Sequence, residues 1–262
     1  MLEGRRWARD VVLTARKIAT GLGWLGLWWA AGCGAHAQDI GWADLVHAPS
    51  QRARSEASPL SRPQEAATVT RETSGTAFFV DGSGHMLTAR HAAENCARLL
   101  VLKEGRAVAA HLVALSASAD LAIIKVPKTL GLAAVFPNQA VASANDMVFA
   151  SAYDKLQASR GVLANATIAA NAGEAGALLI DSDITFGASG APVLDGRGLV
   201  QGVVSRRIAE RRVLAVGAVE AKSFLAANGV PIDQDDRSQI AGASARADRA
   251  ASISARVICV QN

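Results

Sequence analysis

The amino-acid sequence predicts an all-β protein, and three observations indicate this class. From about residue 67 the chain consists of short apolar runs separated by turn signals. The runs are three to ten residues long, which is the length range of strands. Only two stretches have a persuasive helical pattern. Many short strands at this spacing are typical of a β-barrel or a β-sandwich.

The strands can be assigned in order along the chain. Residues 75–80 and 85–88 flank residues 81–84, which have the composition of a tight turn, so they predict a hairpin. Further strands are predicted at residues 99–102, 108–115, 121–126, 146–150, 161–170, 178–180, 192–194, 198–204, 212–216 and 255–260. The helical stretches are a turn at residues 91–96 and a helix at 219–227, followed by an Asn-Gly stop signal.

The N-terminus has the pattern of an export signal. A basic stretch ends at Lys17, an apolar stretch covers residues 18–31, and Ala-His-Ala precedes Gln38 as a cleavage site. Cleavage there predicts a periplasmic or secreted protein without stable membrane insertion. Two alternatives remain: acylation of Cys33 as in lipoproteins, and an uncleaved anchor at residues 18–35.

The sequence divides into four parts. A signal peptide at residues 1–37 precedes a polar, proline-interrupted leader at 38–66, which reads as flexible. A folded domain is predicted at residues 67–232. Residues 233–262 form a C-terminal tail, which we expect to be loosely ordered up to residue 255.

Charge excludes one class of partner. The 262 residues carry a net charge of +4, but residues 1–37 hold five basic and two acidic residues, which leaves 22 basic against 21 acidic. A near-neutral domain gives no support for nucleic-acid binding. Four arginines still cluster in sequence and predict a solvated hairpin tip: Arg206, Arg207, Arg211 and Arg212.

Two cysteines remain if Cys33 leaves with the signal. Cys96 and Cys259 form an even pair in an exported chain, which permits a disulfide. A disulfide between them would link the C-terminal tail covalently to the first half of the domain. The alternative is that both cysteines are free thiols. The histidines and cysteines show no metal-ligand spacing, so no metal is expected.

Three local motifs together indicate acyl-transfer chemistry. Ser189 lies in the glycine-flanked turn Gly187-Ala-Ser-Gly, where its hydroxyl and nearby N–H groups are exposed. A serine hydroxyl needs a base, and His91 in Thr-Ala-Arg-His can supply one. Asp120 can orient that histidine. The backbone N–H groups of Gly187 and Ser189 would then face the developing oxyanion.

The three motifs resemble those of the chymotrypsin-fold serine peptidases, especially the bacterial trypsin-like and HtrA-type branch. They occur in the order His91, Asp120, Ser189, with separations of 29 and 69 residues. The resemblance covers about residues 68–228, and no later segment resembles a PDZ domain. It implies two six-stranded antiparallel β-barrels, at about 67–135 and 136–232, with a short C-terminal helix.

The resemblance also implies a function. The chain is expected to be a serine endopeptidase that hydrolyses protein or peptide substrates through an acyl-enzyme, without a cofactor. Ser205, in Gly-Val-Val-Ser, is expected to line the substrate cleft. Asp183 matches the acid at the base of a trypsin-like specificity pocket, whereas Asp181 matches the HtrA-type pattern with its preference for small apolar side chains.

The motif around the serine departs from the family pattern. Ala191 replaces a second glycine, and Ala188 replaces a residue that is often polar. A catalytically impaired module that binds peptides in the cleft is therefore an alternative to the endopeptidase. An esterase with the same three residues is another.

Overall fold

The computed structural model describes residues 71–139, 146–159, 166–171, 176–184, 186–240 and 245–262. The predicted signal peptide at residues 1–37 and the leader at 38–66 lie outside the described residues. Within the described part of the chain, no helix is long and apolar enough to span a membrane.

The first half of the domain is a closed six-stranded barrel. Its strands are connected in the order β1-β14-β3-β4-β5-β2, and every neighbouring pair is antiparallel. The strands are β1 (Arg71–Phe79), β2 (His85–Thr88), β3 (Arg98–Lys103), β4 (Arg106–Leu115), β5 (Ala122–Lys125) and β14 (Ser254–Gln261).

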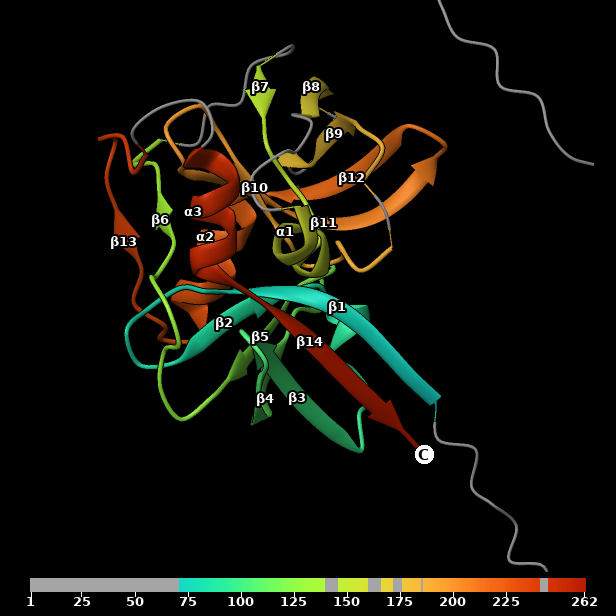
Figure 1. Cartoon of the computed structure of the whole chain (residues 1–262). Helices are drawn as coiled ribbons and strands as arrows, with labels where there is room; N and C mark the ends of the chain where they lie inside the picture. The colour runs from blue at the N-terminus through green and yellow to red at the C-terminus, as the bar shows by residue number, and fades with distance from the viewer. Residues whose placement is uncertain (1–70, 140–145, 160–165, 172–175, 185, 241–244) are drawn as a thin grey trace, which may run out of the picture. The chain divides into compact units, whose positions relative to one another are not determined.

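The closing strand of this barrel comes from the C-terminal end of the sequence. Figure 1 shows β14, in red, lying beside β1. The sequence analysis anticipated a strand here but assigned it to a tail outside the domain, which was wrong. Ala255, Val257 and Cys259 are fully buried in the barrel interior. Because β14 pairs with both β1 and β3, it removes two open edges that would otherwise be exposed.

The second half is a six-stranded antiparallel sheet in the order β10-β11-β12-β9-β8-β7. An isolated bridge joins its two ends, because Phe149 and Leu194 each donate a backbone hydrogen bond of 2.8 Å to the other. The predicted all-β class with two barrels is therefore confirmed; among the described residues, this bridge is what closes the second barrel. The strands are β7 (Met147–Val148), β8 (Ala166–Asn171), β9 (Leu178–Asp181), β10 (Pro192–Leu194), β11 (Val200–Ala209) and β12 (Arg212–Gly217).

In the described part of the chain, three α-helices accompany the sheets. The predicted helix at residues 219–227 is present as α2 (Ala218–Ala227). The helices α1 (Tyr153–Ser159) and α3 (Ala245–Ile253) were not predicted. The buried residues of α3 include Ala247, Ala250 and Ile253. The stretch was assigned to a loosely ordered tail because it is rich in alanine, serine and arginine.

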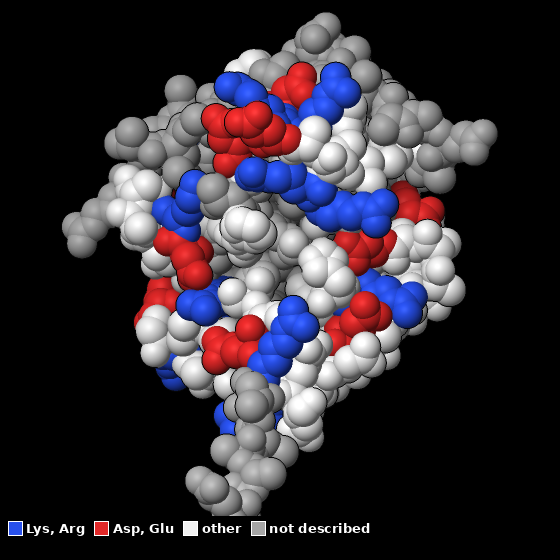
Figure 2. Space-filling view, turned by 90° about the vertical axis from the view of Figure 1, so that its right-hand side faces the viewer, with Lys and Arg blue, Asp and Glu red and all other residues white. Residues whose placement is uncertain are grey.

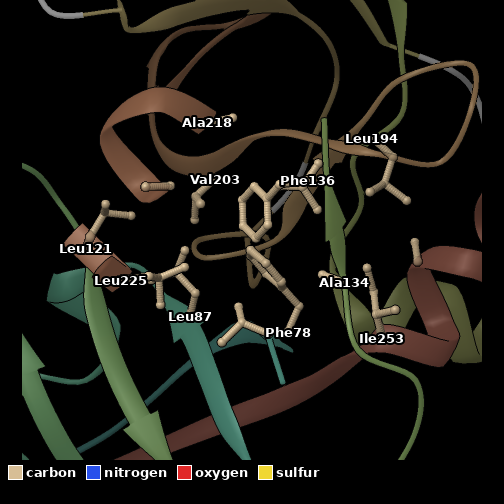
Figure 3. Close-up of a cluster of buried hydrophobic side chains, with 14 of the residues drawn as sticks. Phe78, Leu87, Leu121, Ala134, Phe136, Leu194, Val203, Ala218, Leu225 and Ile253 are labelled. Atoms are coloured by element: carbon tan, nitrogen blue, oxygen red, sulfur yellow. The ribbon is translucent and has the colours of Figure 1, made fainter. Parts of the chain in front are cut away.

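One hydrophobic core joins the two halves. Figure 3 shows Phe78 and Leu87 of the first barrel packed in the same cluster as Val203 of β11. Leu225 of α2 and Ile253 of α3 complete the cluster and are fully buried. Because this core is shared, it fixes the orientation of the two barrels and of any site between them.

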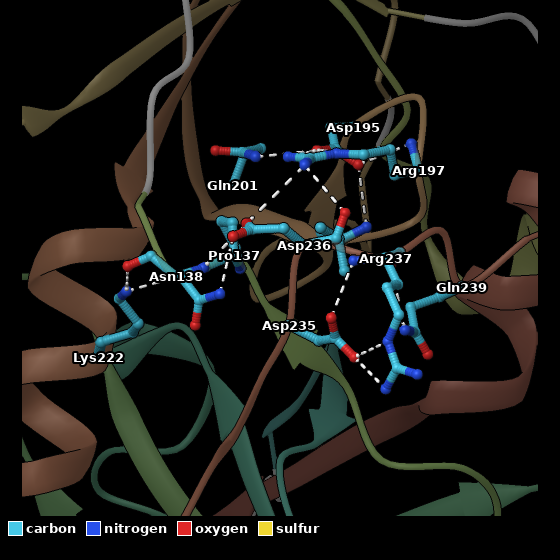
Figure 4. A network of polar contacts seen from close by, with 11 residues as sticks. Pro137, Asn138, Asp195, Arg197, Gln201, Lys222, Asp235, Asp236, Arg237 and Gln239 are labelled. Atoms are coloured by element: carbon cyan, nitrogen blue, oxygen red, sulfur yellow. Dashed lines mark hydrogen bonds and ion pairs between the residues drawn. The ribbon is translucent and has the colours of Figure 1, made fainter.

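The segment before α3 is also part of the fold. β13 (Asp233–Gln234) pairs in parallel with β6 (Val135–Phe136). Figure 4 shows Asp236 between Asn138 and Arg197: Asn138 Nδ2 donates to its carboxylate at 2.7 Å, and Arg197 Nη1 donates to its carbonyl at 3.2 Å. These polar contacts carry no hydrophobic period, which is why the sequence suggested a loosely ordered tail.

A disulfide links Cys96 to Cys259, with 5.2 Å between the two Cα atoms. It ties β14 to the segment that follows His91. The bridge spans 163 residues of the sequence. It therefore restricts a very large loop in the unfolded chain.

Loss of this disulfide is expected to lower the free energy of unfolding by about 3–5 kcal/mol, because the unfolded chain regains loop entropy. Urea unfolding with and without reductant measures the change. The double variant C96S/C259S serves as the control and should be insensitive to reductant. An unchanged unfolding midpoint on reduction would contradict the expectation.

Candidate active site

His91 and Asp120 form a close pair at the edge of the first barrel. His91 lies in the short 3₁₀ turn Arg90–Ala92 that follows β2. Its Nδ1 atom is 2.9 Å from Asp120 Oδ2, and its backbone N–H donates to Oδ1 at 3.1 Å. Asp120 therefore orients the ring and the backbone of His91 together.

Ser205 completes the surroundings of Asp120. Its hydroxyl donates a 2.6 Å hydrogen bond to Asp120 Oδ2. Burial by itself would raise the pKa of Asp120, but hydrogen bonds from His91 and Ser205 outweigh it and lower that pKa to about 2. The carboxylate is thus ionised at neutral pH.

The pKa of His91 is raised above its ordinary value. The hydrogen bond to Asp120 is the main cause, and it outweighs the partial burial of the ring. The positive charge of Arg206 acts in the opposite direction. The imidazole is therefore a stronger base than a free histidine.

Ser189 sits in a tight turn that requires glycine on both sides. Gly187 and Gly190 have φ values of 86° and 85°, in the left-handed region. A side chain at Gly190 would also collide with the carbonyl of Thr76 and the hydroxyl of Thr88. The glycines thus let the turn lie directly against β1.

Thr76 of β1 anchors this turn at two points. Its N–H donates to the carbonyl of Ser189 at 2.8 Å, and its hydroxyl donates to the carbonyl of Gly187 at 2.7 Å. Within the described residues, the backbone N–H groups of Gly187 and Ser189 donate no hydrogen bond. They are the expected oxyanion donors. The sequence analysis missed Thr76, whose only signal is a hydroxyl in a buried apolar strand.

Ser189 and His91 line the same cavity, which has a volume of about 320 Å³. The serine comes from the second barrel and the histidine from the first, so the cavity lies between the two halves. The walls are apolar and are formed by the buried side chains of Ile184, Ala188, Val204 and Val213.

The acids proposed for substrate selection lie elsewhere. Asp183 is 77% exposed and pairs with Arg211 at 3.7 Å, and Asp181 pairs with Arg212 at the same distance. Neither acid lines the cavity. Asp183 therefore lies at the surface beside an arginine of the neighbouring hairpin, and a pocket role for it has no support from this arrangement.

The structure also shows where Ser205, the arginine cluster and Ala191 lie relative to the cavity. Ser205 lines the cavity as expected, but its hydroxyl is committed to Asp120. Arg206 and Arg207 line the cavity too, so the arginine cluster is only partly a solvated tip. Ala191 is fully buried in the core of the second barrel, so its methyl group does not crowd the cavity.

No group of three or more histidine, cysteine, aspartate or glutamate side chains within the described ranges is arranged to hold a metal ion. The chemistry available at the site is that of a serine hydroxyl, an imidazole and backbone N–H donors. These groups match the requirements of acyl transfer.

Comparisons with known proteins agree with this fold. Residues 75–203 match the family described as "Trypsin-like peptidase domain". A serine endoprotease from Yersinia pestis has a similar structure, with a TM-score of 0.52, 22% identity, and 60% of this chain and 57% of that chain covered. The HtrA-type protease AlgW, solved with a decapeptide, gives a TM-score of 0.50 and 20% identity over 59% of this chain and 51% of its own.

A relative by sequence is the uncharacterized protein y4bJ of Sinorhizobium fredii. It is 28% identical over 201 residues, which are 71% of this chain and 32% of that protein. The chain thus spans about a third of the length of this relative. The two structural neighbours are likewise covered over little more than half of their length.

Proposed function

We propose that the chain is an exported serine endopeptidase. Residues 75–203 match the trypsin-like peptidase family, and the fold is of the chymotrypsin type, which together support this proposal. The observation that carries the proposal is the position of Ser189 on the same cavity as the His91–Asp120 pair. These residues come from both barrels and from three distant parts of the sequence.

The proposed reaction begins with attack of Ser189 Oγ on the carbonyl carbon of a peptide bond. His91 Nε2 takes the hydroxyl proton, and Asp120 stabilises the resulting imidazolium. The N–H groups of Gly187 and Ser189 bind the oxyanion. Collapse breaks the C–N bond, and His91 returns the proton to the leaving amine. Water then hydrolyses the acyl-enzyme by the same route.

The open edge of β11 supports a peptide as the substrate. On the side opposite β12, the pairing of β11 with β10 reaches only Val203, and Val204 contacts the nucleophile turn. Beyond Val204, none of the described strands pairs with this edge. A peptide in extended conformation can add there as a further strand and bring its carbonyl to Ser189.

Two features support export. The N-terminal pattern is that of a cleaved signal, with acylation of Cys33 as the alternative. The Cys96–Cys259 disulfide fits an oxidising compartment such as the periplasm or the extracellular space.

The central test is Ser189→Ala. Wild-type protein should cleave an unfolded protein substrate and react with a serine-directed fluorophosphonate. The variant should not be labelled, and its kcat should fall by about 10⁴-fold or more. Ser182→Ala, in the same loop but away from the cavity, is the matched control and should behave like the wild type. Wild-type protein that is neither labelled nor active would favour the peptide-binding module.

The apolar walls predict the side chain that is preferred at the cleaved bond. A small or medium apolar side chain fits the cavity, and no described acid lies at its walls to select Arg or Lys. Asp183→Ser should therefore leave the preference in a peptide library unchanged, whereas Ile184→Ala should shift it toward larger side chains. Cleavage after Arg or Lys that disappears in Asp183→Ser would contradict this prediction.

A further inference from the structure

A second cavity also borders His91. It has a volume of about 440 Å³ and is bounded by the loop at residues 117–120 and by Arg206. His91 and Arg206 line both cavities, so the two cavities are neighbours.

The order of the two cavities follows from strand geometry. Consecutive side chains of an extended peptide point to opposite sides. The apolar cavity contains Ser189 and so receives the side chain at the scissile carbonyl. An extended peptide that adds antiparallel to β11 runs toward Ser189, so its residues before the scissile bond lie along β11 beyond Val204. The cavity lined by Arg206 of β11 then receives the side chain of the preceding residue.

The charges around this second cavity are mostly compensated. Asp120 accepts hydrogen bonds from His91 and Ser205. Arg90 pairs with Glu94 at 2.9 Å and donates to a backbone carbonyl at 2.8 Å. Ser118 donates to the nearby Glu220 at 3.0 Å.

Arg206 is different. Its side chain is exposed, and among the described residues its guanidinium has no hydrogen bond or ion pair. Figure 2 shows the side toward which the β11–β12 hairpin projects, with a band of Lys and Arg side chains across it. An uncompensated guanidinium over a cavity is suited to bind a carboxylate through paired, charge-assisted hydrogen bonds.

We propose that this cavity is a subsite for an acidic side chain, in which Arg206 binds the carboxylate of the Glu or Asp that precedes the residue at the cleaved bond. The inference rests on the proposed peptidase function and adds a substrate class to it. The preferred substrate carries an apolar residue at the cleaved bond and an acidic residue directly before it. A lysine at the same position would face the like charge of Arg206 and is disfavoured.

An acidic side chain bound in this subsite is also expected to change the pKa of His91. Arg206 lowers the pKa of His91 in the free protein. A bound carboxylate offsets this charge, so the pH profile of kcat for an acidic peptide should be displaced to higher pH than that for a neutral one.

The experiment compares tetrapeptide anilides that end in Val and carry Glu, Gln or Lys before it. Wild-type kcat/KM should be about fivefold higher for Glu than for Gln, and lowest for Lys, as expected for an exposed ion pair. Arg206→Gln should bring the Glu-to-Gln ratio to about one. Arg212→Gln, on the same hairpin but paired with Asp181, should keep the wild-type ratio. High salt should weaken the preference.

A measurement of peptide binding distinguishes failure of this inference from failure of the proposed function. Fluorescent tetrapeptides with a free C-terminus are titrated into the full-length Ser189→Ala variant, with and without Arg206→Gln. If the wild type cleaves nothing, tighter binding of the Glu peptide that depends on Arg206 still supports the subsite. Equal cleavage or equal binding of Glu and Gln peptides, or a preference that survives Arg206→Gln, overturns it.

Discussion

Asp120→Asn is expected to lower kcat by about 10⁴-fold, because the carboxylate holds the histidine in the tautomer that can accept a proton from serine. In the structure Asp120 accepts from the ring Nδ1 and the backbone N–H of His91. An asparagine amide can present an N–H to Nδ1, which leaves the proton on Nε2. His91 can then no longer act as the base toward Ser189.

The measurement is peptide hydrolysis as a function of pH. In the wild type the rate should rise as His91 loses its proton, with a midpoint above the ordinary value of 6.5, because the hydrogen bond to Asp120 raises the pKa of His91. In Asp120→Asn the remaining activity should show a lower midpoint. Asp120 itself, with a pKa of about 2, stays ionised over the whole range.

A matched control separates this effect from the loss of any surface carboxylate. Asp154→Asn removes an acid on α1 that pairs with Arg256 at 3.4 Å, remote from the cavity. It should retain the activity and the pH midpoint of the wild type. A small loss of kcat in Asp120→Asn, or an unchanged midpoint, would refute the assigned role of Asp120.

Truncation after Ile253 is expected to abolish cooperative folding. The truncation removes β14 and leaves β1 and β3 without the strand that joins them. It also removes three fully buried apolar side chains, those of Ala255, Val257 and Cys259, worth about 1–3 kcal/mol each, and the disulfide through Cys259. The combined loss is comparable to the whole stability of a typical domain, about 5–15 kcal/mol.

Circular dichroism and thermal unfolding can detect this loss. Truncation after Val260 is the control, since it removes only Gln261 and Asn262 and keeps the disulfide. C96S/C259S isolates the part of the effect that is due to the bridge. A soluble protein truncated after Ile253 that unfolds cooperatively would show that the barrel does not need β14.

The predicted elements were most accurate where local chemistry decides them. Strands β1 to β5 were recognisable from short apolar runs between turn residues, and α2 from its helix-forming residues and its Asn-Gly end. The helix α3 was missed because it lies in a stretch rich in alanine, serine and arginine, a composition that suggested loose order. The role of β14 was missed because strand order depends on contacts between residues far apart in sequence.

In the candidate site, too, the residues in local motifs were predictable and the long-range contacts were not. His91, Asp120 and Ser189 were identifiable because each lies in a short motif with the right order and spacing. The anchoring of the nucleophile turn by Thr76 was not, since it joins residues 111 positions apart. The role of Asp183 was left open, because Asp181 and Asp183 match two different family patterns, whereas the exposure of Asp183 and its pairing with Arg211 depend on the tertiary structure.

The sequence by itself determined the all-β class, the family resemblance and the three residues expected to perform the chemistry, because strand composition, tight turns and reactive side chains are local properties. Only the tertiary structure decided that the C-terminal strand closes the first barrel and that Ser189 shares a cavity with His91. It also decided that Arg206 lies beside two cavities, where its guanidinium pairs with none of the described residues. Those features depend on which distant segments pack together, and packing is set by burial and long-range pairing.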